Sequence, residues 1–225
     1  MLKKIISLAI KHIKNRDYQF DKRVSNSVVF FLAVSRLLDL IRGIVLLRKI
    51  SFVGGGTRLR SGSMVTCGKG FSIGKYCDID ALSEYGLCFG SGVSIGGHSV
   101  IKASGTYSDI GKGINIGNNV GIGEFAHIGG AGGVIIGSNT IVGPYLSIHP
   151  ENHVFLDKQV IIRKQGVTRK GITIGSNCWI GAKVTVLDGS IIGNGSVVAA
   201  GAVVSGIFPD NSVIGGVPAR ILKER

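Results

Sequence analysis

The sequence predicts a mainly β fold in which short parallel strands wind into a triangular coil, preceded by a helical segment. Glycine accounts for 36 of 225 residues and hydrophobic residues for 44%, which indicates many tight turns between apolar strands. An aliphatic residue followed by a small one also recurs every six positions. Six residues is neither a helical period nor the two-residue period of a strand, but it fits one short strand and a turn. Three such units close one coil, and stacked coils pair their strands in parallel.

Residues 1–50 are expected to form a basic amphipathic helical segment. They contain eleven Lys or Arg and three Asp, and so carry eight of the thirteen net positive charges. Apolar residues follow a helical period over residues 2–13, and a second helix is predicted over about 27–50. Two interpretations stay open: the helices pack on the main body or a neighbouring subunit, or they contact the inner face of a membrane.

A membrane-spanning helix and an exported protein are both disfavoured. The apolar stretch 28–47 contains Arg36, Asp39 and Arg42, and each charge is costly at the centre of a bilayer. The first apolar run is short and no cleavage pattern follows it. The four cysteines are scattered without a Cys-x-x-Cys pair, as in a reduced cytosolic protein. We therefore expect a cytoplasmic protein, with peripheral contact at the inner membrane face as the open alternative.

Residues 51–225 are predicted to form the coil domain. The register is clearest in the pairs Ile110-Gly111, Ile116-Gly117, Ile122-Gly123, Ile128-Gly129, Ile174-Gly175, Ile180-Gly181, Val186-Leu187 and Ile192-Gly193. The aliphatic residue would point inward. The small residue would lie at a corner, where a side chain would crowd the bend or where φ is positive. Residues 221–225 are predicted to cover one end of the stack.

A polar stretch interrupts the repeat between Ile148 and Ile174. A stack of coils cannot bury polar backbone of this kind, so residues 149–171 are predicted to leave the core as a loop. The loop contains two histidines, His149 and His153, four residues apart.

The chain resembles the hexapeptide-repeat acyltransferases, especially those that acetylate sugars, polysaccharides and certain antibiotics. The residues that carry the resemblance are Asn152, His153, Phe155, Asp157, and the segments 162–166, 174–182 and 216–223. The resemblance implies a left-handed parallel β-helix, a homotrimer, and acetyl-CoA bound along a groove between subunits. No metal is implied.

By this resemblance His153 is the general base, with His149 as the alternate. A histidine with a pKa near neutrality suits removal of a proton from a hydroxyl nucleophile. Asn152 and Asp157 are expected at the acceptor site, although Asp157 equally suits a turn cap. Glu124 breaks the apolar pattern before the loop and is a further candidate for acceptor binding, with a surface position as the simpler alternative.

The resemblance also implies a set of coenzyme A contacts. Small side chains would let the pantetheine arm lie against the coil, and basic residues of the tail would meet the nucleotide phosphates. The cofactor-binding candidates are Trp179, Ala182, Lys183, Ala200, Ser205, Arg220 and Lys223.

The predicted function is transfer of an acetyl group from acetyl-CoA to a sugar hydroxyl, in biosynthesis of a bacterial surface polysaccharide such as capsule, exopolysaccharide or O-antigen. Alternatives are acetylation of a small sugar or an antibiotic, and a non-catalytic scaffold. A further alternative is a zinc carbonic anhydrase that uses His127, His149 and His153 from adjacent subunits. Nucleic-acid binding is disfavoured, because the repeat lacks a stripe of basic and aromatic residues.

Overall fold

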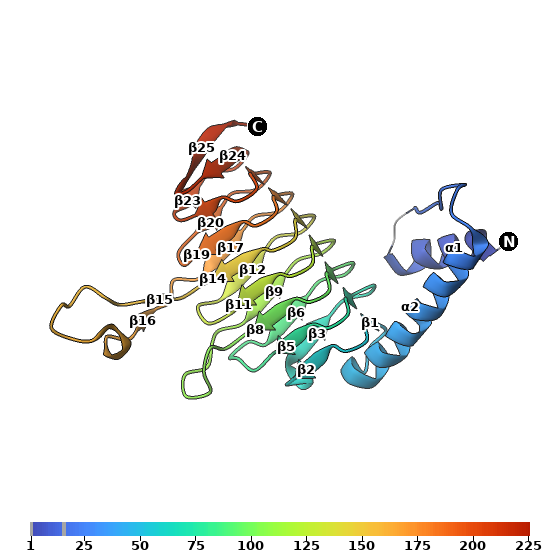
Figure 1. The fold of residues 1–225 in the computed structure, drawn as a ribbon, viewed down its shortest axis with the longest axis horizontal. Helices are drawn as coiled ribbons and strands as arrows, with labels where there is room; N and C mark the ends of the chain where they lie inside the picture. Colours follow the sequence, from blue (N-terminus) through green and yellow to red (C-terminus); the bar gives the residue numbers. More distant parts are fainter. Residues whose placement is uncertain (1, 15–16) are drawn as a thin grey trace.

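The computed structural model describes residues 2–14 and 17–225. Two helices, α1 (Leu2–Lys14) and α2 (Asn26–Leu47), precede a tapering stack of coils (Figure 1). The helical pair lies at the β1 end of the stack, and the C-terminus lies at the opposite end. The expected helical segment followed by a coil domain is therefore present.

In the described residues the coils form three parallel sheets, here called A, B and C. Sheet A contains β1 (Phe52–Val53), β4 (Ser72–Ile73), β7 (Ser94–Ile95), β10 (Gly121–Ile122), β13 (Ile141–Val142), β18 (Trp179–Ile180), β21 (Val197–Val198), β24 (Ser212–Gly216) and the antiparallel β25 (Ala219–Glu224). Sheet B contains β2 (Arg58–Arg60), β5 (Asp78–Asp80), β8 (Val100–Lys102), β11 (His127–Gly129), β14 (Ser147–His149), β19 (Thr185–Leu187) and β22 (Val203–Val204). Sheet C contains β3 (Val65–Cys67), β6 (Leu87–Phe89), β9 (Ile114–Ile116), β12 (Val134–Ile136), β17 (Ile172–Ile174), β20 (Ile191–Ile192) and β23 (Ile207–Phe208).

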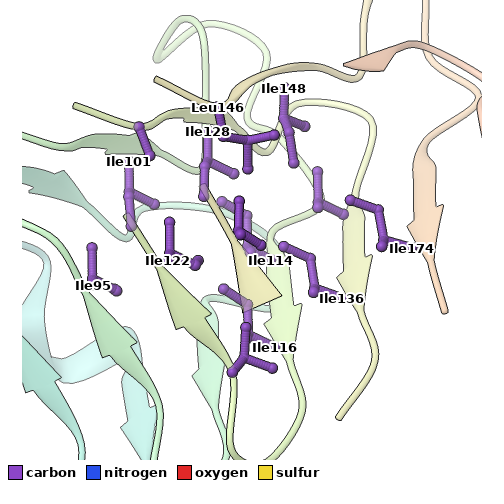
Figure 2. Packing of buried hydrophobic residues seen from close by; sticks show 14 of the residues in the cluster. Ile95, Ile101, Ile114, Ile116, Ile122, Ile128, Ile136, Leu146, Ile148 and Ile174 are labelled. Atoms are coloured by element: carbon purple, nitrogen blue, oxygen red, sulfur yellow. The ribbon is translucent and has the colours of Figure 1, made fainter. Parts of the chain in front are cut away.

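The core is a column of aliphatic side chains stacked in register from coil to coil. Ile122 pairs with Val142 in sheet A, Ile128 with Ile148 in sheet B, and Ile136 with Ile174 in sheet C. Figure 2 shows these isoleucines converging inside the triangle, where Ile128, Ile148 and Ile174 have no exposed surface. Burial of each such side chain stabilises the fold by about 1.5–3 kcal/mol, which explains why the inward position of the hexad is aliphatic.

Glycines after the inward residue allow adjacent coils to approach closely. A Cβ atom at Gly123 would lie 2.5 Å from the Pro144 nitrogen, and one at Gly181 would lie 2.5 Å from the Ala200 nitrogen. Crowding is therefore the reason for the small residue. The alternative reason, a positive φ at the same position, is wrong at this corner. The positive φ falls two residues later, as at Lys183 (φ 58).

Long insertions leave the stack at the corner between sheets B and C. The predicted loop leaves after β14 and returns at β17, and a shorter loop lies between β8 and β9. The long loop contains an antiparallel hairpin of β15 (Asn152–His153) and β16 (Val167–Thr168), and a 3-10 turn η2 (Ile162–Lys164). Figure 1 shows this hairpin standing away from the coils. The prediction that the polar stretch leaves the core is confirmed.

The second helix is anchored at its C-terminal half. Gly43 and Leu47 are buried, and a Cβ atom at Gly43 would collide with the backbone of Ser51. Asp39 is buried and forms ion pairs with Arg36 (3.6 Å) and Arg42 (3.4 Å). The three charged residues of this helix are therefore paired with one another on one side of it. Among the described helices, none is long and apolar enough to cross a bilayer.

The helix ends earlier than predicted, at Leu47, where Arg48 adopts a left-handed conformation and donates its N–H to the Ile44 carbonyl. A short 3-10 turn, η1 (Gly62–Met64), connects β2 to β3. At the other end of the chain, β25 folds back on β24, with Val213 opposite Lys223. The predicted C-terminal cover is this strand, which extends sheet A.

Candidate functional site

Two histidines lie side by side on the outer face of sheet B. His127 begins β11 and His149 ends β14, and both flank inward isoleucines. Their ring centroids are 5.6 Å apart with an interplanar angle of 24°. Ser147, paired with His127 in the sheet register, has its Oγ 2.7 Å from Nε2 of His149. The hydroxyl therefore fixes the orientation of the His149 ring.

The surroundings of His127 favour its neutral imidazole. Partial burial lowers the pKa of His127, and the nearby His149 and Lys102 lower it further. Lys102 ends β8 and pairs with Gly129 in the register. Pro150 lies against Gly129, where a Cβ atom would be 3.3 Å from its Cδ atom.

His153 is placed differently from His149, although only four residues separate them. It lies on β15, where it pairs with Val167, and its side chain is exposed to solvent. The Nε2 atom of His149 is engaged by Ser147, whereas His153 belongs to the projecting hairpin. Asn152, also exposed, pairs with Thr168 in the same hairpin.

Arg169 fastens the base of this hairpin. Its Nε lies 2.6 Å from Oε2 of Glu151, and one of its terminal nitrogens lies 3.0 Å from Oδ2 of Asp109. The Arg169 side chain is only 19% exposed. Asp109 belongs to the shorter insertion, so one guanidinium links both loops. The buried carboxylate of Asp188 accepts the N–H groups of residues 170 and 171, which fixes the returning strand.

Asp157 lies near the tip of the loop and caps a local turn. Its Oδ1 accepts the N–H of Gln159 at 2.8 Å. The side chain of Gln165 closes the same tip, because it donates to the carbonyl oxygens of Asp157 and Val160 and accepts the N–H of Asp157. The turn-capping alternative for Asp157 accounts for its contacts.

Several coenzyme A candidates gather at the corner between sheets A and B. Ala182 and Ala200 occupy equivalent positions in successive coils, and the N–H of Gly201 donates to the Ala182 carbonyl at 2.9 Å. Lys183 is exposed beside them, and Trp179, 59% exposed, lies on sheet A of the same coil. Glu124 is exposed on this corner as well, between β10 of sheet A and β11 of sheet B.

The remaining cofactor candidates lie elsewhere. Ser205 is exposed just after β22, on the far side of sheet B from Ala200. Arg220 and Lys223 are exposed on β25. A single chain therefore does not bring all seven candidates into one groove.

The corner between sheets A and B also has a ladder of aromatic rings that sequence reasoning missed. Tyr76, His98, Phe125 and Tyr145 each have a positive φ and stack on one another, with centroids 5.0–5.3 Å apart. Lys183 occupies the next position, where its N–H donates to Pro144. The signal was available in the sequence, since these residues all come two places after a glycine of the hexad.

The contacts among His127, Ser147 and His149 were also not predicted from the sequence. His127 was assigned only to the zinc alternative. The hexad register holds the missing information, because His127 and Ser147 each precede an inward isoleucine and so must share one face. The contact of Arg169 with Asp109 has no such signal, because it joins two irregular loops.

Comparison with known proteins agrees with the coil architecture. Residues 171–206 match the sequence profile of the family described as bacterial transferase hexapeptide (six repeats). This match covers part of the coil stack, from the end of the long loop to the residues just after β22. A search of curated proteins found no match to this chain.

Solved structures with the same fold include AntD, an N-acyltransferase from Bacillus cereus. A mutant of AntD in complex with dTDP-4-amino-4,6-dideoxyglucose and coenzyme A is 16% identical, with a TM-score of 0.52 and coverage of 82% of this chain and 87% of that chain. AntD with dTDP and 3-hydroxybutyryl-CoA is 17% identical, with a TM-score of 0.51 and coverage of 79% and 81%. A hexapeptide-repeat acetyltransferase from Vibrio cholerae O1 biovar eltor, complexed with acetyl coenzyme A, is 23% identical, with coverage of 96% and 97% and a TM-score of 0.43. The predicted left-handed parallel β-helix is confirmed as the fold.

Proposed function

We propose that this protein is an acetyl-CoA-dependent O-acetyltransferase that modifies a sugar hydroxyl during synthesis of a bacterial surface polysaccharide. The observation that carries the proposal is the placement of an exposed histidine, His153, on a hairpin that leaves the coils and whose base is closed by the ion pair of Arg169 with Glu151. His149 ends β14, the strand after which this hairpin leaves the coils, and its ring stacks on that of His127.

In the proposed reaction His153 is the general base. Its neutral imidazole accepts the proton of the acceptor hydroxyl while the oxygen attacks the thioester carbonyl. The tetrahedral intermediate collapses with cleavage of the carbon–sulfur bond. The imidazolium then returns the proton to the departing thiolate, so coenzyme A leaves as the thiol. His153 is favoured over His149 because the Nε2 atom of His149 is already engaged by Ser147.

Acetyl-CoA is proposed to lie along the corner formed by Ala182 and Ala200. Small side chains there leave the coil backbone accessible to an extended pantetheine arm. Arg220 and Lys223 would pair with the phosphates of coenzyme A. Trp179 and Ser205 lie on other faces of the coils and would contact the coenzyme there. Since one chain spreads these residues over several faces, we propose a homotrimer in which neighbouring subunits complete each groove.

The acceptor is proposed to be a lipid-linked or nucleotide-linked sugar. AntD, which shares this fold at low identity, was crystallised with a dTDP-linked amino sugar and with coenzyme A, which supports sugar nucleotides as first acceptors to test. Glu124, Asn152 and Asp157 remain proposed acceptor contacts. Because acetyl-CoA is the donor, the reaction is proposed to occur in the cytoplasm.

The proposal is tested by thiol release from acetyl-CoA across sugars, sugar nucleotides and extracted surface glycans. We expect turnover with one acceptor class, at least about a hundredfold lower in His153→Ala, since general-base catalysis contributes factors of this size. His149→Ala tests the alternate base, and His12→Ala in α1 is the matched control. Full activity of the His153 variant would overturn the assignment. Lack of coenzyme A binding by the wild-type protein would overturn the proposed function.

A further inference from the structure

One side of α2 has a continuous apolar surface that faces solvent. It comprises Phe30, Phe31, Val34, Leu37, Leu38, Ile41, Ile44 and Val45, here called the α2 stripe. These side chains are 40–71% exposed. At the helical period they cover an arc of about 140° that contains no charged residue of α2. Exposed apolar surfaces of this extent mark binding sites.

The α2 stripe does not attach the helix to the coils. The residues that anchor α2, Asp39, Gly43 and Leu47, lie on the opposite side of the helix. Arg36 and Arg42 pair with Asp39 and therefore also lie off the stripe. The stripe is thus available to a second partner while α2 stays docked on the first coil.

Charge indicates which partner fits. Residues 1–50 contain eleven Lys or Arg, and the three Asp of this segment are all paired: Asp17 with Lys11, Asp21 with Arg23, and Asp39 with two arginines. The remaining positive charge favours an anionic partner and opposes close approach of two copies of the same segment. An apolar helix face within a basic segment is the pattern of helices that lie in the interface of an anionic bilayer.

We propose that the α2 stripe docks into the interface of an anionic lipid bilayer, with the helix parallel to the membrane plane. The helix does not cross the bilayer, in agreement with the charges of Arg36, Asp39 and Arg42. Lys3 and Lys4 of α1 add attraction to anionic headgroups. Because α2 lies at the β1 end of the stack (Figure 1), docking directs the first coil toward the membrane and keeps the C-terminus away from it. This inference does not depend on the proposed acetyl transfer.

The test is sedimentation of the full-length protein with vesicles of equal parts phosphatidylcholine and phosphatidylglycerol, and with vesicles of phosphatidylcholine alone. We expect binding to the anionic vesicles that weakens at about 0.5 M NaCl, where charge is screened. The stripe variant F31Q/V45Q should bind at least about tenfold more weakly, because each substitution removes a large apolar group from the buried face.

The matched control is L156Q/I161Q, which makes the same number of changes at exposed apolar positions of the hairpin tip. It should bind as the wild type does, and circular dichroism melting should show that both variants are folded. Equal binding of the stripe variant and the wild type would overturn the proposal. It would also be overturned if lipid-free light scattering showed that the wild type is an oligomer that F31Q/V45Q dissociates, because the stripe would then be a subunit interface.

Discussion

Replacement of Arg169 by methionine should release the hairpin that carries His153 without unfolding the coils. Arg169 pairs with Glu151 at 2.6 Å and with Asp109 at 3.0 Å. Asp109 is 64% exposed, so solvent screens that pair and it contributes little. The Glu151 pair is better shielded, since the two side chains are 19% and 27% exposed. Its loss should make local opening of the hairpin easier by about 1–3 kcal/mol, the range for leaving a shielded polar group without its hydrogen-bond partner.

Each 1.4 kcal/mol is a factor of about ten in an equilibrium constant, so the open population of the hairpin should rise about 5- to 150-fold. Hydrogen exchange measures this directly. Amides of residues 152–154 and 166–168 should lose protection in R169M, while those of β11 and β14 keep it. If His153 is the base, turnover should fall with the same variant, because the imidazole is less often in place.

Lys158→Met is the matched control, since it removes a positive charge from the exposed tip of the same loop. It should leave both protection and turnover near the wild-type values. Arg169→Lys should recover part of the protection, because one ammonium can still pair with Glu151. Unchanged exchange in R169M would refute the inference that this guanidinium fastens the hairpin.

Three further predictions concern the coils. Because the folded-state pKa of His127 is below its ordinary value of 6.5, the unfolded chain takes up this proton first. The free energy of unfolding should therefore fall as the pH drops through 6.5, and denaturant titrations should show a smaller fall in H127Q. Ile148→Ala should lower the free energy of unfolding by about 2–5 kcal/mol in the same titrations, because truncation of this fully buried side chain leaves a cavity in the core. Gly181→Val should lower the melting temperature, since any Cβ there meets the Ala200 nitrogen at 2.5 Å, whereas substitution at Gly105, which has open space around it, should not.

Much of the fold follows from the six-residue period. The inward isoleucines, such as Ile122 and Ile128, define the strands, and the stacked register follows from burying them. The break at residues 149–171 was also predictable, because polar backbone cannot join the stacked core. The two helices were predicted, but the end of α2 was not, since the chain turns at Arg48 through a backbone conformation that the sequence does not favour.

The candidate site was less predictable because it depends on outward residues. Hexad periodicity specifies what points inward and leaves outward positions free to vary, so His127 and Ser147 carry no periodic signal of their own. Their proximity to His149 follows only once the coils are stacked in register. The link from Arg169 to Asp109 depends on the conformations of two irregular loops, which local sequence does not determine.

The central claim is that His153 removes the proton from an acceptor hydroxyl. It is tested most directly by the rate of thiol release from acetyl-CoA, with the acceptor that gives turnover, in the wild type, His153→Ala and His149→Ala. We expect a loss of at least about a hundredfold in His153→Ala, with unchanged coenzyme A binding and a smaller loss in His149→Ala. Wild-type turnover in His153→Ala together with its loss in His149→Ala would show instead that His149, on sheet B, is the base.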